Sequence, residues 1–188
     1  MRGKRRKKDM SKKLLSILVV GILVLCSVFA SNHSVEVQIS PFSFQKIKLN
    51  VPAEYNSQYG WGAKVGYRYG TVAYAGADLS YSNYKYEEQD NRYLVWTLMA
   101  KGGVFVDIAK SFKVDMAIGA GADLRVWGDL AKFYPTAGFY LGGLFNVSEK
   151  VGVTAGADLR FAWQDNKDSA YSSMDTDVIC SLGARVNL

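Results

Sequence analysis

Hydrophobic and polar residues alternate along most of this chain from residue 34 onward. In each stretch one face carries valine, leucine, alanine and aromatic residues, and the other carries glycine, serine and charged residues. Alternation with a period of two is typical of β-strands whose two faces meet different environments, and no stretch has a convincing helical period. The predicted strands are residues 35–49, 61–69, 72–84, 93–108, 114–127, 134–147, 151–163 and 177–188.

The connections between these strands alternate in length. Short links follow the second, fourth and sixth strands, at residues 70–71, 109–113 and 148–150. Longer polar links follow the others, at residues 50–60, 87–92, 128–133 and 164–176. Strands of 9–16 residues are long enough to cross a bilayer when tilted, and transmembrane barrels have tight turns at one end and loops at the other. The sequence therefore predicts an all-β protein, an eight-stranded antiparallel up-and-down transmembrane barrel.

One five-residue pattern, Ala-Gly-Ala-Asp-Leu, occurs in three of the predicted strands, at residues 75–79, 120–124 and 155–159. In a strand its glycine and aspartate share one face. The three strands run in the same direction in an up-and-down barrel. We therefore expect Asp78, Asp123 and Asp158 to lie at similar depth.

Alternation alone does not say which face is inside, because a soluble lipocalin-like barrel has the same period. Glycines decide the orientation, since a glycine on an open face only weakens a strand, whereas a narrow barrel has room for few large side chains. Only Gly102 and Gly143 lie on the apolar face. The glycines on the polar face are Gly62, Gly66, Gly76, Gly103, Gly119, Gly121, Gly138, Gly142, Gly152, Gly156 and Gly183. The charged face is therefore predicted to line the lumen.

This orientation predicts a network of charges inside the barrel. Basic and acidic residues nearly balance on this face, as a self-paired interior requires, because an unpaired charge in a narrow lumen is costly. We interpret the network as a salt-bridge plug rather than a gated ion path, since eight strands enclose little space. Its predicted members are Lys64, Arg68, Asp78, Lys101, Asp107, Asp115, Asp123, Arg125, Asp158, Arg160 and Arg185.

The first 30 residues have the pattern of a secretory signal peptide, with eight basic residues followed by an apolar run at residues 14–30. The predicted domains are a signal peptide at residues 1–30 and a barrel at 31–188. An uncleaved membrane anchor and a lipoprotein cysteine at Cys26 are the alternatives. The whole chain has a net charge of +6. Without the leader, 15 basic and 16 acidic residues remain, a net charge of about −1, so no nucleic-acid partner is expected.

Candidate residues for catalysis or metal binding are few. Acyl transfer in a barrel enzyme needs a histidine base, and the one histidine, His33, precedes the first predicted strand, so we predict no enzyme. Four aspartates crowd the last long link, but their spacing fits no ordered calcium loop, and we interpret them as solvated. These are Asp165, Asp168, Asp175 and Asp177. No metal or other cofactor is expected.

In architecture, residues 34–188 resemble the small eight-stranded outer-membrane barrels of diderm bacteria, of the OmpX, OmpA-barrel and opacity type. The resemblance lies in the leader, the eight alternating strands, the asymmetric loops and a last strand that runs to the chain end. It implies residence in the bacterial outer membrane and an assembly signal in the last strand, at Leu182, Ala184, Val186 and Leu188. The family usually ends in phenylalanine, and this chain ends in Leu188.

The sequence leaves the physiological role open. A structural or adhesin-like surface role, with loops that engage a host or surface ligand, is the main expectation. The expected partners are outer-membrane lipid, lipopolysaccharide and the assembly machinery, and the barrel is expected to be a monomer. The alternatives are a narrow conduit for small or hydrophobic molecules and a soluble periplasmic lipocalin-like binder.

Overall fold

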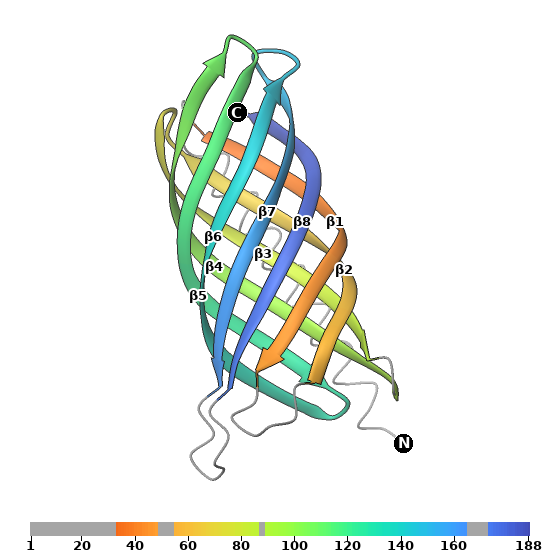
Figure 1. Ribbon diagram of the computed structural model, residues 1–188. Helices are drawn as coiled ribbons and strands as arrows, with labels where there is room; N and C mark the ends of the chain where they lie inside the picture. Colours follow the sequence, from red (N-terminus) through yellow and green to blue (C-terminus); the bar gives the residue numbers. More distant parts are fainter. Residues whose placement is uncertain (1–32, 49–54, 87–88, 165–172) are drawn as a thin grey trace, which may run out of the picture.

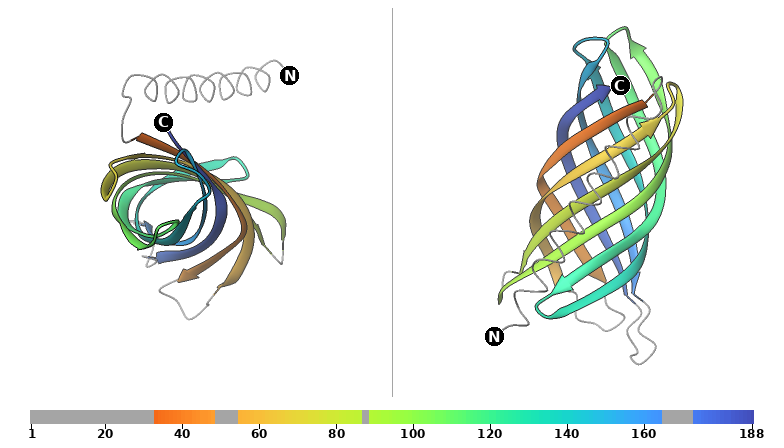
Figure 2. Two further views of the ribbon diagram at one scale, coloured as in Figure 1. Left: turned by 90° about the horizontal axis from the view of Figure 1, so that it is seen from above. Right: turned by 180° about the vertical axis from the view of Figure 1, so that it is seen from behind.

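The computed structural model describes residues 33–48, 55–86, 89–164 and 173–188, which form one closed antiparallel barrel of eight strands (Figure 1). Viewed along its axis, the sheet closes on itself into a ring (Figure 2). The strands are β1 (His33–Lys48), β2 (Tyr55–Tyr69), β3 (Ala73–Tyr86), β4 (Gln89–Ala109), β5 (Phe112–Trp127), β6 (Leu130–Asn146), β7 (Val151–Gln164) and β8 (Ser173–Asn187). The predicted number of strands and their antiparallel order are confirmed.

Each strand pairs with its neighbours in sequence, and β8 pairs with β1 to close the barrel, with Ser34 opposite Asn187. The short connections β2–β3, β4–β5 and β6–β7 lie at the same end of the barrel as the C-terminus, at the top of Figure 1. We call this the turn end, and the opposite end, which holds the β5–β6 connection, the loop end. Among the described residues, no helix is long and apolar enough to cross a membrane.

The outer surface of the barrel is apolar and its interior is charged. Ile39 and Ile118 are each 63% exposed and Leu98 is 61% exposed, whereas the inward-facing Asp123 and Arg68 are 0% and 1% exposed. A soluble lipocalin-like barrel would have the reverse arrangement. The predicted orientation of the two faces is confirmed, and the outer surface is suited to hydrocarbon rather than water.

Aromatic side chains gather at both ends of this apolar surface. Near the loop end Trp61, Tyr81 and Trp96 form a continuous row, with ring centroids 5.7 Å apart for the first pair and 4.9 Å for the second. Near the turn end Tyr69 and Phe145 are both exposed. Trp61 and Tyr69 lie eight residues apart on β2, a strand length of roughly 26 Å, which matches the apolar band of membrane barrels before tilt shortens it. We call the two groups the aromatic girdles.

All four links predicted to be long are shorter than expected because the strands beside them are longer. Strand β2 begins at Tyr55 rather than at residue 61, and β4 begins at Gln89 rather than at residue 93. The link predicted at residues 128–133 is the two-residue connection Gly128-Asp129, and Trp127 pairs directly with Leu130. Gly128 has a φ of 55°, a conformation that favours glycine. Strand β8 begins at Ser173 rather than at residue 177. The predicted signal peptide, Asp165 and Asp168 lie outside the described residues.

Candidate functional site

Charged side chains on the inner face are almost completely shielded from solvent. Residues two apart on a strand share a face, so the polar rows of neighbouring strands point into one narrow lumen. Among the described residues, this buried set contains six basic and seven acidic side chains, whose charges nearly cancel. They are Glu36, Lys64, Arg68, Asp78, Lys101, Asp115, Asp123, Arg125, Asp158, Arg160, Asp175, Asp177 and Arg185.

A chain of ion pairs crosses the middle of the lumen. Lys64 Nζ lies 2.7 Å from Asp158 Oδ2, and Lys101 Nζ lies 2.7 Å from both Asp158 Oδ1 and Asp78 Oδ2. Arg68 donates from Nη1 to Asp78 Oδ1. These five residues, which we call the central network, come from β2, β3, β4 and β7 and therefore join walls that are not neighbours in the sheet.

Tyr140 of β6 lies against this network and helps to fill the lumen. The Nζ atoms of Lys64 and Lys101 are 4.5 Å and 4.9 Å from the centroid of its ring, within the range of a cation–π interaction. A void beside Lys64, Asp158 and Arg160 measures about 10 Å³, room for about one water molecule. At this depth the lumen is closed by side chains.

A second group of charges lies nearer the loop end. Arg125 pairs with Asp175 through Nη1 and with Asp123 Oδ2 at 3.2 Å through Nη2. Arg160 Nη1 donates to Thr97 Oγ1 at 2.6 Å, and Thr97 donates in turn to Asp123 Oδ1 at 2.8 Å. The group contains two of the four predicted arginines, Arg125 and Arg160, and one predicted aspartate, Asp123.

Asp175 and Asp177 were interpreted from the sequence as solvated loop residues, and this interpretation is wrong. Both lie on β8 and are 0% and 2% exposed. Their alternation is in phase with Ser181 and Arg185 on the inner face of the same strand. That phase, together with the positive charge of Arg125 opposite, was the sequence signal that could have placed them in the lumen.

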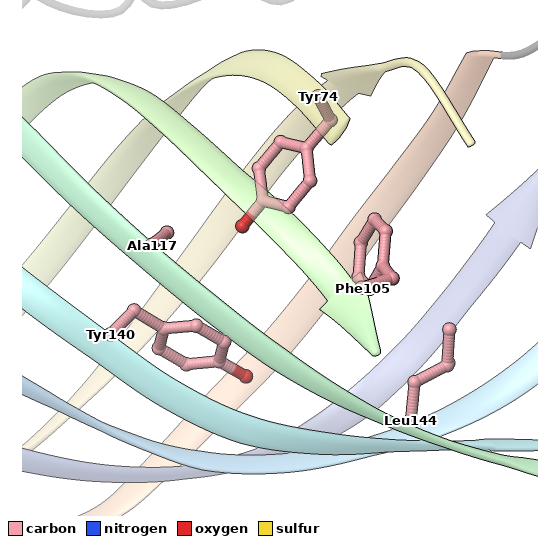
Figure 3. Close-up of a cluster of buried hydrophobic side chains, with 5 residues drawn as sticks. All are labelled: Tyr74, Phe105, Ala117, Tyr140 and Leu144. Atoms are coloured by element: carbon pink, nitrogen blue, oxygen red, sulfur yellow. The ribbon is translucent and has the colours of Figure 1, made fainter. Parts of the chain in front are cut away.

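Aromatic and aliphatic side chains fill the lumen near the turn end (Figure 3). The Tyr74 and Phe105 rings stack with their centroids 4.7 Å apart, and the Tyr74 hydroxyl donates to Asp115 Oδ1 at 2.7 Å. The cluster consists of Tyr74, Phe105, Ala117, Tyr140 and Leu144.

The aspartates of the repeated pattern do not all meet. Lys101 bridges Asp78 and Asp158 as expected for residues at similar depth. Asp123 instead belongs to the group near the loop end, where it accepts from Thr97 and Arg125. The expectation therefore holds for two of the three strands.

The structure corrects the prediction for Asp107. Its side chain is 65% exposed and lies 3.0 Å from Lys113 Nζ, across the β4–β5 turn. Because Asp107 is two residues from the end of β4, it lies beyond the enclosed part of the barrel. The residues of the predicted assembly signal are exposed at the C-terminal end of the chain: Leu182, Ala184, Val186 and Leu188.

His33 lies within β1 rather than before the first strand. It is 6% exposed, and its Nδ1 forms a hydrogen bond with the Tyr67 hydroxyl. Within the described ranges, no group of three or more histidine, cysteine, aspartate or glutamate side chains is arranged to hold a metal ion.

Comparison with solved structures identifies the architecture. The chain aligns with Neisserial surface protein A (NspA) at a TM-score of 0.64 and 15% identity, over 84% of this chain and 98% of that one. It has the fold of the small eight-stranded outer-membrane β-barrels.

Two further solved structures align at lower TM-scores. Ail of Yersinia pestis aligns at a TM-score of 0.46 and 13% identity, over 82% of this chain and 99% of Ail. OprG of Pseudomonas aeruginosa aligns at 0.44 and 11% identity, over 84% and 97%. No family model matches the sequence, and no curated protein matches it. At these identities the similarity concerns the fold alone.

Proposed function

We propose that this chain is an outer-membrane barrel with a closed lumen, and that it acts as a structural or surface-interaction protein rather than as a channel. The observation that carries the proposal is the position of Lys101, whose Nζ lies 2.7 Å from carboxylates on β3 and β7 at once. With Lys64 and Arg68 on β2, this bridge blocks the middle of the lumen. An ion or nutrient has no path through such a plug.

The outer face supports placement in the outer membrane. Its apolar residues need a hydrocarbon environment, and the aromatic girdles are positioned where the headgroups of a bilayer would lie. The leader at residues 1–30 supplies export, and the exposed apolar residues at the end of β8 supply a signal for the assembly machinery. In the part of the chain that the structure describes, every strand pairs on both sides, which favours a monomer.

A closed lumen leaves the loop end as the working surface. Large apolar side chains are exposed there, with Phe133 at 74% and Tyr59 at 54%. Aromatic side chains supply contact area at low entropic cost. The partners that fit this surface are lipopolysaccharide or an equivalent outer-membrane lipid, and a host or environmental ligand held by the loops.

Cell fractionation with gel migration tests the placement. We expect the protein in the outer-membrane fraction, with faster migration before boiling than after, because a folded barrel resists the detergent. Recovery from the soluble periplasm, or identical migration in both samples, would contradict the outer-membrane proposal.

Conductance in planar bilayers tests the closed lumen. We expect no stable current steps from the wild-type barrel. The triple variant Lys64→Ala, Lys101→Ala and Asp158→Ala is expected to conduct, because it removes three of the five side chains of the central network and the bridge between its walls. The matched control, Asp107→Asn, changes an exposed ion pair and should stay closed. Steady channels in the wild-type protein would favour the narrow conduit instead.

A further inference from the structure

A cavity of about 560 Å³ opens at the turn end of the barrel, and two members of the cluster in Figure 3, Phe105 and Leu144, line it. The side chains that matter to its chemistry are Ser34, Phe105, Lys110, Lys113, Leu144 and Arg185. Lys110 and Lys113 lie at the β4–β5 turn and Arg185 lies deeper, on the inner face of β8. The cavity is distinct from the plugged middle of the lumen.

Arg185 has an unusual environment for a buried cation. It is 6% exposed, and it makes no hydrogen bond or ion pair with another described residue; its Nε is buried without a partner. Its Cζ atom lies 4.3 Å from the centroid of the Phe105 ring, within the range of a cation–π interaction. A buried guanidinium has five donors, so leaving it without an anion is costly.

The nearest carboxylates are held by other donors. Glu36 faces Arg185 across the β1–β8 ladder, but it accepts from Gln38 and lies 3.9 Å from Arg68. Asp115 accepts from the Tyr74 hydroxyl at 2.7 Å. These acids act on Arg185 only through longer-range electrostatics. The guanidinium is therefore available to a ligand that enters the cavity.

Other lining groups define the remaining chemistry. Ser34 Oγ is buried without a hydrogen-bond partner, which provides a second donor or acceptor close to the cavity. Phe105 and Leu144 are 4% and 5% exposed and belong to the same apolar cluster, so they form an apolar floor. Lys110 at the rim adds positive charge, which the rim residue Glu149 offsets in part.

We propose that this cavity binds a small organic oxyanion, a carboxylate or phosphate on an apolar body. Arg185 pairs with the anionic group, Ser34 contributes a hydrogen bond, and the apolar body rests on Phe105 and Leu144. Arginine suits this role because its planar fork matches an oxyanion. The proposal of a binding site depends only on the structure of the barrel. The further statement that the cavity opens to the periplasm rests on the proposed outer-membrane placement.

Benzoate and benzamide form a matched pair of probes, since they share a ring and differ in charge. We expect titration of the refolded barrel in detergent, followed by two-dimensional NMR, to show saturable shifts with benzoate at the Arg185 Nε–H and at the amides of Ser34 and Leu144. Benzamide should bind at least tenfold more weakly. Inorganic phosphate should also bind more weakly than benzoate, because it has no ring to place on the apolar floor.

Variants separate the site from general electrostatics. Arg185→Gln should weaken benzoate binding at least tenfold, whereas Lys132→Gln, an equal loss of charge at the exposed loop end, should change it less than about twofold. If Arg185→Gln does not fold, the wild-type shift map and Ser34→Ala, expected to weaken binding severalfold, decide the matter. Equal binding of benzamide, shifts confined to other residues, or no saturation with benzoate would overturn the proposal. If phosphate binds as tightly as benzoate, the proposed contact between the ligand and the apolar side chains of Phe105 and Leu144 would be wrong.

Discussion

The lysines of the lumen depend on carboxylates that other strands supply. Asp158 forms ion pairs with both Lys64 and Lys101, and each of the two contacts is 2.7 Å long. Removing a partner from a buried ion pair leaves an uncompensated charge, which is far more destabilising than the loss of an exposed pair. Asp158 is therefore the residue whose loss should affect the barrel most.

Replacing Asp158 by Asn tests this dependence. We expect the free energy of unfolding to fall by roughly 3–5 kcal/mol, because two buried lysines lose their shared carboxylate. Asp107→Asn, which breaks the exposed pair with Lys113, should cost less than about 1 kcal/mol. Urea unfolding in lipid vesicles, followed by tryptophan fluorescence, measures both. Equal stability of the two variants would contradict the plug.

Two glycines that face opposite sides of the wall provide a second test. A Cβ added to Gly121, on the inner face, would overlap the Leu98 carbonyl oxygen and lie 2.7 Å from Met99 Cα. The same atom on Gly102, on the outer face, would meet nothing closer than the Tyr74 carbonyl oxygen at 4.0 Å.

We expect Gly121→Ala to destabilise the barrel by roughly 1–3 kcal/mol, since a packed wall has no space for the methyl group. Gly102→Ala should be close to neutral. The same urea unfolding experiment compares the two variants, and a neutral Gly121→Ala would mean that the inner face is not crowded there.

At the scale of strands, alternation predicted where each strand lies better than where it ends. The interior of β7 was predicted correctly because its charged and apolar residues alternate without interruption. The start of β6, at Leu130 rather than residue 134, was missed because the charged Lys132 resembles a loop residue. Pro135 is tolerated because β6 pairs there with Ala122 of β5, whereas the recorded ladder to β7 begins only at Thr136.

The β5–β6 connection isolates a backbone effect from packing. Gly128 has a positive φ, and nothing lies within 4 Å of an added Cβ. We expect Gly128→Val to cost roughly 1–2 kcal/mol, because a β-branched residue is strained in this conformation. Gly128→Asn should cost less than about half of that, since asparagine adopts it more readily. Urea unfolding distinguishes the two, and equal losses would point to a cause other than φ.

At the scale of the whole molecule, the sequence predicted the orientation of the wall but not the partners inside it. The glycines on the polar face were sufficient to predict that the charged side chains point inward, because this prediction needs only the alternation along each strand. Which lysine meets which aspartate depends on the tilt and stagger of non-adjacent strands, which alternation does not encode. The link between Lys64 on β2 and Asp158 on β7 is such a contact.

The apolar exterior predicts the depth at which an outward-facing tryptophan lies in the bilayer. Trp96 lies on the outer face in the girdle near the loop end. In a variant that retains only this tryptophan, we expect lipids brominated along the acyl chain to quench its emission, because the ring lies at the edge of the hydrocarbon region. Strong quenching by aqueous acrylamide together with no effect of brominated lipid would contradict a lipid-facing wall.

The pairing of β8 with β1 also has a consequence for biogenesis. The segments that complete the ring lie about 150 residues apart, from Ser34 to Asn187, so closure is the most entropically demanding step of folding and cannot occur before β8 is available to pair with β1. Until that moment both terminal strands have unsatisfied backbone groups that could pair with any other extended polypeptide. A chain whose first and last strands have not yet met is therefore at risk of pairing with its own copies.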